Sequence, residues 1–208
     1  MFLATGFLPS FLFLGGITVK ELEEKILREG VVLPGEILKV GSFLNQQIDV
    51  AFLMRMGDEV ARLYKGQEIT KVLTIEASGI AFAFAIAERL GVPMVFAKKH
   101  ASANVSGEIY TARVHSYTHN RDNDIVISKE YLKPEDKILI ADDFLAVGGA
   151  LGGLLSIVDQ AKASLAGCAI AIEKGFQGGG DRLRAKGIRV ESLAIIESMT
   201  DDSLTFRA

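Results

Sequence analysis

K-I-L-I-A-D-D-F-L-A-V-G-G-A-L runs from Lys137 to Leu151 and contains the parts of one strand–turn–helix unit. The apolar residues 138–141 predict a buried strand that ends on the adjacent carboxylates of Asp142 and Asp143. A turn of small residues follows, made of Ala146, Val147, Gly148, Gly149 and Ala150. After the turn, leucine and valine recur at the spacing of a helix, at Leu151, Leu154, Leu155 and Val158.

Such a unit predicts an anion site, because the turn and the helix N-terminus offer backbone N–H groups. The two carboxylates would lie at the carboxyl end of a strand, where open α/β sheets bind their ligands. A sugar phosphate satisfies both halves, since it is anionic at one end and hydroxylated beside it. Plainer explanations stay open from the local sequence: a tight connection at Gly148-Gly149, and solvated or helix-capping acids. The stretch lacks the Gly-Lys-Ser/Thr of a Walker A loop and the G-x-G-x-x-G of a dinucleotide-binding loop.

Length and composition are typical of one globular domain with a sizeable core. The chain has 208 residues, 49% of them hydrophobic, and its 23 basic and 26 acidic residues nearly balance. The net charge of −3 argues against a basic groove along a nucleic acid. The single cysteine, Cys168, lies in an apolar run, so we expect a core residue in a reducing compartment rather than a catalytic thiol.

Residues 1–18 differ from the rest of the chain, because they are apolar and carry no charge. The run is short for a membrane span, contains Gly6 and Pro9, and lacks the basic start and cleavage site of a signal peptide. We expect an N-terminal extension outside the core, with residues 19–208 forming the single domain. If the extension is native, contact with a membrane or a partner becomes possible.

Strand and helix patterns alternate along the chain in the way that builds a parallel sheet. Strands are predicted at 71–75, 92–97, 137–141 and from 165, and a last one at 188–196 before an irregular tail. Asp49 is a candidate N-cap for a helix after an irregular segment at 31–47. Alternation over 109–114, with a return at 124–128, predicts a hairpin.

The unit at 137–151 resembles the phosphoribosyl-diphosphate signature of type I phosphoribosyltransferases. The similarity extends over most of the chain, from about Val19 to Phe206, and is closest to the bacterial members that act on xanthine. Six blocks carry it: E-G-V-V-L at 29–33, L-K-V-G-S-F-L-N-Q-Q-I-D at 38–49, T-I-E-A-S-G-I-A at 74–81, V-F-A-K-K-H at 95–100, A-D-D-F-L-A at 141–146 and I-E-K-G-F-Q at 172–177.

The resemblance implies an α/β fold with a central, mostly parallel sheet flanked by helices, a small hood, and a flexible flap at about 102–118. It also implies a reaction in which a purine nitrogen displaces diphosphate from C1 of 5-phospho-α-D-ribose 1-diphosphate. Positive charge then builds on the sugar and negative charge on the leaving group, so catalysis depends on positioning and electrostatics. The implied product is xanthosine 5′-monophosphate, made in the salvage of purines.

By the same resemblance, Asp142 and Asp143 contact the ribose, and Ala146, Val147, Gly148, Gly149 and Ala150 hold the 5-phosphate. The strand-to-helix turn of Glu76, Ala77, Ser78 and Gly79 faces the diphosphate, and Lys98 and Lys99 pair with its oxygens. A plain helix cap by Ser78, and solvated lysines at a strand end, are the alternatives. The signature has Val147 and Gly149 where a polar residue is expected in at least one place, so fewer side-chain contacts to the phosphate are expected while backbone contacts remain.

The purine contacts implied by the resemblance are Leu38, Asn45, Lys174 and Phe176. Lys174 would donate to the oxygen at C6, which adenine lacks, and Asn45 can donate and accept along an oxopurine edge. Guanine or hypoxanthine stays open as the base, because the choice of xanthine rests on the resemblance alone. Gly178-Gly179-Gly180 makes the loop expected after Lys174 looser than a version that carries proline.

Mg²⁺ is the implied cofactor, carried mainly by the diphosphate rather than by a protein cluster, since it takes few protein ligands. His100, His115 and His119 are irregularly spaced and are expected on the surface. The resemblance also implies a cytoplasmic homodimer that binds no nucleic acid. A transcriptional regulator that senses phosphoribosyl diphosphate is a weaker alternative, because 19–49 offers no recognition helix and no basic patch.

Overall fold

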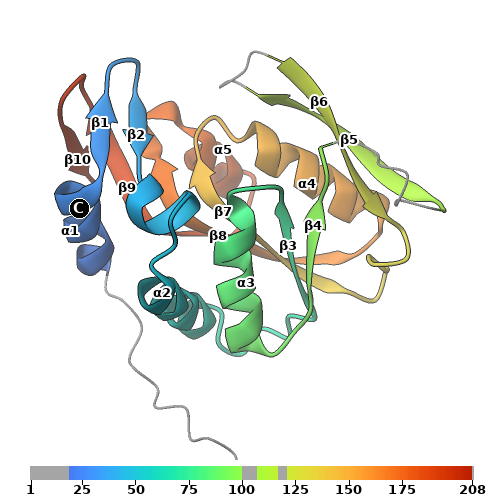
Figure 1. Ribbon diagram of the computed structural model, residues 1–208. Helices are drawn as coiled ribbons and strands as arrows, with labels where there is room; N and C mark the ends of the chain where they lie inside the picture. The colour runs from blue at the N-terminus through green and yellow to red at the C-terminus, as the bar shows by residue number, and fades with distance from the viewer. Residues whose placement is uncertain (1–18, 100–106, 117–120, 208) are drawn as a thin grey trace, which may run out of the picture.

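The computed structural model describes residues 19–99, 107–116 and 121–207 (Figure 1). The predicted extension at 1–18, His100, His119 and parts of the predicted flap lie outside the described residues, as does the side chain of His115.

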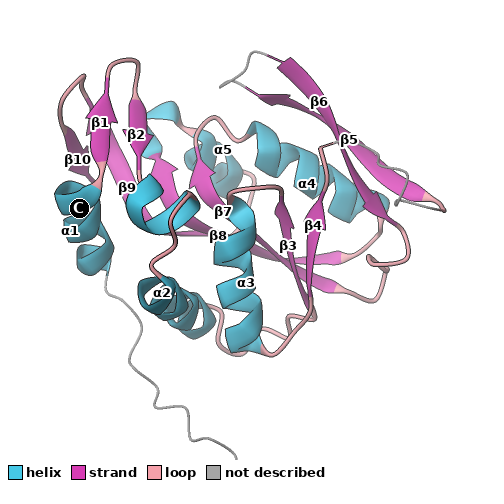
Figure 2. Cartoon of the chain, in the orientation of Figure 1, coloured by secondary structure: helices cyan, strands magenta, loops and turns pink. Residues whose placement is uncertain are grey.

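Among the described residues, six strands form a sheet in the order β10-β9-β8-β7-β3-β4 (Figure 2). All neighbouring strands are parallel except β10 and β9, which confirms the prediction of a mostly parallel α/β sheet. The strands span β3 (Lys71–Ile75), β4 (Met94–Ala97), β7 (Lys137–Leu145), β8 (Ser164–Lys174), β9 (Val190–Met199) and β10 (Leu204–Phe206).

Helices cover both faces of the sheet, and each central strand supplies side chains to both, because successive side chains point to opposite faces. In β7, Leu139 and Ala141 pack with the helices α2 (Val50–Leu63) and α3 (Gly79–Leu90), whereas Ile138 and Ile140 pack with α4 (Gly149–Gln160). The helix α1 (Val19–Glu29) covers part of the first face through Leu22 and Ile26, which are almost fully buried. The apolar run of β7 thus serves two cores.

The segment predicted as irregular at 31–47 is ordered, so that prediction was wrong. It forms the hairpin β1 (Val31–Leu33) and β2 (Ile37–Lys39), followed by a π-helical turn at Gly41–Asn45, which together make the hood. Gly35 and Glu36 form the hairpin turn with positive φ angles of 81° and 59°. Asp49 caps α2 as predicted, since its side chain accepts a hydrogen bond from the N–H of Phe52.

The predicted hairpin is also present, as β5 (Ile109–Ser116) and β6 (Arg121–Ser128). The hairpin packs against α4 at Gly153, where there is no room for a side chain: a Cβ on Gly153 would lie 2.7 Å from Val114 Cγ1. Lys98, just after β4, forms paired backbone hydrogen bonds with Val126 of β6. The hairpin is therefore held beside the carboxyl ends of the central strands.

Two further predictions about the C-terminal part need correction. Gly178-Gly179-Gly180 is not a loose loop: it closes a 3₁₀ turn (Gly175–Gln177) and starts the helix α5 (Gly179–Ala185), where Gly179 and Gly180 are buried. The tail is not wholly irregular either, because β10 pairs with β9. Among the described residues, no helix combines the length and apolar character needed to cross a membrane.

Candidate functional site

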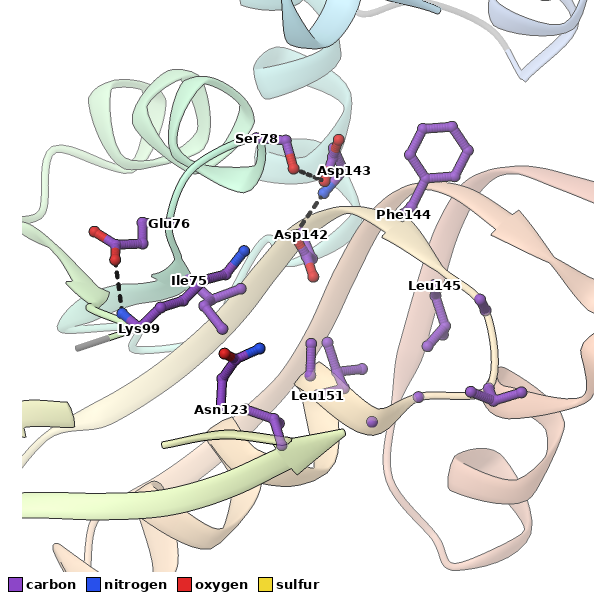
Figure 3. Close-up of a pocket in the computed structure, with 16 residues that line it drawn as sticks. Ile75, Glu76, Ser78, Lys99, Asn123, Asp142, Asp143, Phe144, Leu145 and Leu151 are labelled. Carbon is purple, nitrogen blue, oxygen red and sulfur yellow. Dashed lines mark hydrogen bonds between the residues drawn. The ribbon is translucent and has the colours of Figure 1, made fainter. Parts of the chain in front are cut away.

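A cavity of about 250 Å³ lies at the carboxyl ends of β3 and β7 (Figure 3). This is the sheet edge at which open α/β folds bind ligands. The predicted site residues in its described lining are Glu76, Ser78, Lys99, Asp142, Asp143 and the whole turn from Ala146 to Ala150. The structure therefore brings most of the predicted diphosphate-sugar site together in one place.

Asp142 and Asp143 lie within β7 rather than at its end, because the strand continues to Leu145. Their exposed fractions are 6% and 4%, which excludes the alternative of solvated turn residues. The N–H of Asp143 donates to Oδ1 of Asp142 over 3.0 Å. Burial, followed by the charge of Asp143, raises the pKa of Asp142 well above its ordinary value.

Asp143 is the point at which three segments meet. Its Oδ1 accepts a hydrogen bond from Ser78 Oγ at 2.9 Å, and its Oδ2 accepts one from Asn45 Nδ2 at 3.1 Å. Ser78 precedes α3 without capping it, since its side chain makes no cap hydrogen bond, so the plain-cap alternative is wrong. The carboxylate thus joins the hood, the β3–α3 turn and β7.

The small-residue turn after β7 presents backbone donors. Gly148 has a φ of +87°, a conformation that favours glycine, and α4 begins at Gly149 without a side-chain cap. The first N–H groups of α4 have no carbonyl one turn earlier in the helix to bond. These donors, together with the positive end of the helix dipole, would attract and bind an anion at the turn.

The turn between β3 and α3 approaches the acids from the other side. Gly79 is required there, because a Cβ on it would lie 2.5 Å from both Asp142 Oδ1 and Thr74 Oγ1. Glu76 lines the cavity and accepts a hydrogen bond from the backbone N–H of Lys99 at 2.6 Å. Ala77 is exposed on this turn, and the peptide bond between Glu76 and Ala77 is cis.

The two predicted lysines have different surroundings. Lys99 is exposed and lines the cavity, as a partner for anionic groups would. Lys98 is absent from the described lining, and its backbone is bonded to Val126 of the hairpin. Of the pair, only Lys99 has the geometry expected of a contact to the cavity.

The predicted purine residues are absent from the described lining of this cavity. Asn45 reaches it through Asp143, as above. Leu38 and Phe176 belong to the core on the α2–α3 side. Lys174, at the end of β8, donates from Nζ to the backbone carbonyl of Glu36 in the hood at 2.6 Å. Burial lowers the pKa of Lys174, although the negative charge of Glu36 acts in the opposite direction and raises it.

Six residues that line the cavity were not predicted as site residues: Ile75, Val114, Asn123, Phe144, Leu145 and Leu151. Phe144 packs against the same core as Leu38 and Phe176, and Figure 3 shows its ring on the side of β7 where Asp143 lies. Its place directly after the acids was a usable signal. Val114 and Asn123 come from the hairpin, and no sequence pattern connects them to the acids.

Two other sequence expectations concern metal ions and the thiol. The described residues contain no group of three or more His, Cys, Asp or Glu side chains able to hold a metal ion. Cys168 is buried and free, and burial raises the pKa of its thiol to about 12. A thiol with such a pKa stays protonated at neutral pH, which fits a core residue.

Comparison with known proteins gives a consistent result. Residues 44–196 match the model of the phosphoribosyl transferase domain. The chain is 48% identical over 188 residues to a xanthine phosphoribosyltransferase of Lachnoclostridium phytofermentans, covering 89% of this chain and 97% of that protein. It is 50% identical over 188 residues to a xanthine phosphoribosyltransferase of Bifidobacterium adolescentis, covering 90% and 97%.

A solved structure shares the fold. The adenine phosphoribosyltransferase of Giardia lamblia, in complex with 9-deazaadenine, superposes with a TM-score of 0.72 and 23% identity, covering 88% of this chain and 99% of that one. At this identity the likeness shows the arrangement of strands and helices and not the choice of base.

Proposed function

Because the chain belongs to the phosphoribosyltransferase family, we propose that it transfers the phosphoribosyl group of 5-phospho-α-D-ribose 1-diphosphate to xanthine. The products are xanthosine 5′-monophosphate and diphosphate. The observation that carries the choice of xanthine is the near 50% identity, over almost the whole of their length, to relatives named for that base. The reaction makes the chain a glycosyltransferase of purine salvage.

The phosphate loop, residues 146–150, binds the 5-phosphate in this proposal. Support comes from its backbone donors, from the start of α4 and from the small side chains that leave the backbone accessible. Asp142 and Asp143 lie next to the loop on β7, at the right place for the ribose hydroxyls. An ionised carboxylate there stabilises the positive charge that develops near C1.

Diphosphate binds in the proposal between the Glu76–Gly79 turn and Lys99. The lysine offsets the negative charge of the leaving group, and Glu76 and Ser78 of the turn line the same cavity. Lys98 is assigned no contact to the diphosphate, because it is absent from the described lining and its backbone is bonded to Val126.

The cavity fits Mg²⁺ that arrives with the substrate: Glu76, Asp142 and Asp143 each offer hard carboxylate oxygens, but the described residues form no cluster of three ligands that would hold the ion alone. The ion is held mainly by the substrate and supplies charge neutralisation to the leaving diphosphate.

The base lies on the hood side of Asp143. Asn45 supports this placement, because it already bonds the ribose-binding carboxylate and has polar atoms for an oxopurine edge. Lys174 donates to a carbonyl oxygen of the hood, and the C6 oxygen of xanthine is an acceptor of the same kind. Leu38, Phe176 and the newly found Phe144 provide apolar contacts to the ring.

The assembly state and the role of the ends are part of the same proposal. The protein acts as a cytoplasmic homodimer, with residues 19–208 as its single domain. Removal of residues 1–18 leaves the activity and the dimeric state unchanged, which light scattering and an activity assay of the shortened chain would check.

The test of function is a spectrophotometric assay of purified protein with Mg²⁺, phosphoribosyl diphosphate and each of xanthine, guanine, hypoxanthine and adenine. We expect the highest kcat/KM with xanthine and little use of adenine, which offers Lys174 no oxygen at C6. A clear preference for guanine or hypoxanthine would overturn the assignment of the base while leaving the reaction class intact.

A further inference from the structure

The short helix α5 lies directly behind the phosphate loop (Figure 1). Arg182 Nη2 donates a hydrogen bond to the carbonyl oxygen of Val147 at 3.1 Å. The backbone of Gly179 is packed against the carbonyl of Ala146 so closely that a Cβ would overlap that oxygen. Two successive carbonyls of the loop therefore point toward α5.

This orientation has a consequence for the N–H groups of the loop. Among the described residues the only cis peptide bond is at Glu76-Ala77, so the loop peptides are trans and planar, with each N–H opposite its carbonyl. When the carbonyls of Ala146 and Val147 face α5, the N–H groups of Val147 and Gly148 face away from it. Val147 and Gly148 line the cavity, whereas the described lining includes no residue of α5. Both N–H groups are thus aimed at the side on which an anion would bind.

The helix α5 is itself held firmly to the sheet. Arg184 makes a two-pronged contact with Glu173, with Nη2–Oε2 at 2.7 Å and Nη1–Oε1 at 2.9 Å, and the Glu173 side chain is fully buried. Arg207, after β10, reaches Asp181 of α5 at 3.0 and 3.2 Å. The support behind the loop is therefore fixed independently of any ligand.

We infer that α5 sets the direction of the phosphate-loop N–H groups, with Arg182 and Gly179 as positioning residues for binding of a phosphate monoester. The inference deepens the proposed function, since the monoester in question is the 5-phosphate of the substrate. Neither residue touches the substrate: both act on loop carbonyls.

The experiment measures, by calorimetry, the binding of ribose 5-phosphate and, separately, of inorganic diphosphate with Mg²⁺. Arg182→Ala removes one hydrogen bond, and we expect the affinity for ribose 5-phosphate to fall about threefold to tenfold. Gly179→Ala forces the loop to move, and we expect a loss of tenfold or more. Affinity for diphosphate, which binds at the turn of residues 76–79, should stay within about twofold of wild type. Arg182→Lys should restore part of the lost affinity for ribose 5-phosphate. General destabilisation would lower the affinity for both ligands and would not give this difference.

Two matched controls test the specificity of these changes. Gly152→Ala makes the same substitution in α4 where a Cβ meets open space, and Lys186→Ala removes an exposed cation just after α5. Both should bind ribose 5-phosphate like wild type. Circular dichroism checks the fold of each variant. If Gly179→Ala does not fold, the affinity of Arg182→Ala for ribose 5-phosphate alone tests the inference.

Unchanged affinity of Arg182→Ala for ribose 5-phosphate, or an equal loss for both ligands, would overturn the inference, as would a wild type that does not bind ribose 5-phosphate. The xanthine assay separates this result from the proposed function. A wild type that makes no nucleotide but shows the α5-dependent binding would refute the proposed function and support the inference.

Discussion

Replacement of Arg184 by Met tests how strongly the buried Glu173 depends on its cation. The Glu173 side chain is fully buried, Arg184 bonds both of its oxygens, and the hydroxyl of Ser192 bonds Oε2 as well. Removal of one partner of a buried ion pair costs roughly 3–5 kcal/mol, because the remaining charge has lost its compensation. The Arg184 side chain is 30% exposed, so water can partly reach the vacated space, and we expect the lower end, about 3 kcal/mol.

For a chain of this length, a loss of that size lowers Tm by roughly 6–12 °C. Urea unfolding followed by circular dichroism measures the free energy, and thermal scans measure Tm. The double variant Glu173→Met, Arg184→Met is the matched control: it removes both charges and should be more stable than Arg184→Met alone. A double variant that is less stable than the single one would refute the reasoning, because the cost would then come from lost packing and not from an uncompensated charge.

Three further variants test the site. Asp142→Asn should abolish most activity yet raise the free energy of unfolding at neutral pH. Burial and the charge of Asp143 raise the pKa of Asp142 in the folded protein. The free energy of unfolding of the wild type therefore falls as the pH rises from about 3.8 through the folded-state pKa. Urea titrations should show the advantage vanish near pH 4, and a constant advantage would contradict this origin. Gly79→Ala forces a Cβ against Asp142 and should lower the free energy of unfolding by about 1–3 kcal/mol, measured by urea unfolding, and also lower kcat. A variant with wild-type stability and kcat would mean that the turn can shift to accept the Cβ. Lys174→Ala should raise KM for xanthine far more than KM for phosphoribosyl diphosphate in initial-rate assays, and equal effects on both would remove Lys174 from the base site.

The helix α5 illustrates a failure of local pattern. Three consecutive glycines are poor helix formers by intrinsic propensity, and the local sequence at 178–180 favours a loop looser than one that carries proline. In the structure, glycine is required there for contact: Gly179 lies against Ala146 and Gly180 against the Glu173 carboxylate. Tertiary packing overrides propensity at this point, and the partners are distant in the sequence.

The hood and the lysine pair have a similar explanation. Strands β1 and β2 have three residues each, too few for alternation to distinguish them from irregular chain. Lys98 and Lys99 are adjacent and chemically identical, so no local feature separates them. Their roles diverge because the hairpin bonds the backbone of Lys98 and leaves Lys99 at the cavity.

The sequence by itself determined the strand–turn–helix unit at 137–151, the parallel sheet, and the acids and glycine turn at its edge, because periodicity and glycine placement act over a few neighbouring residues. Only the tertiary structure decided that Asn45 and Ser78 converge on Asp143, that Lys99 rather than Lys98 faces the cavity, and that α5 supports the loop. These contacts join segments up to about a hundred residues apart, and their geometry depends on how the whole sheet twists and packs.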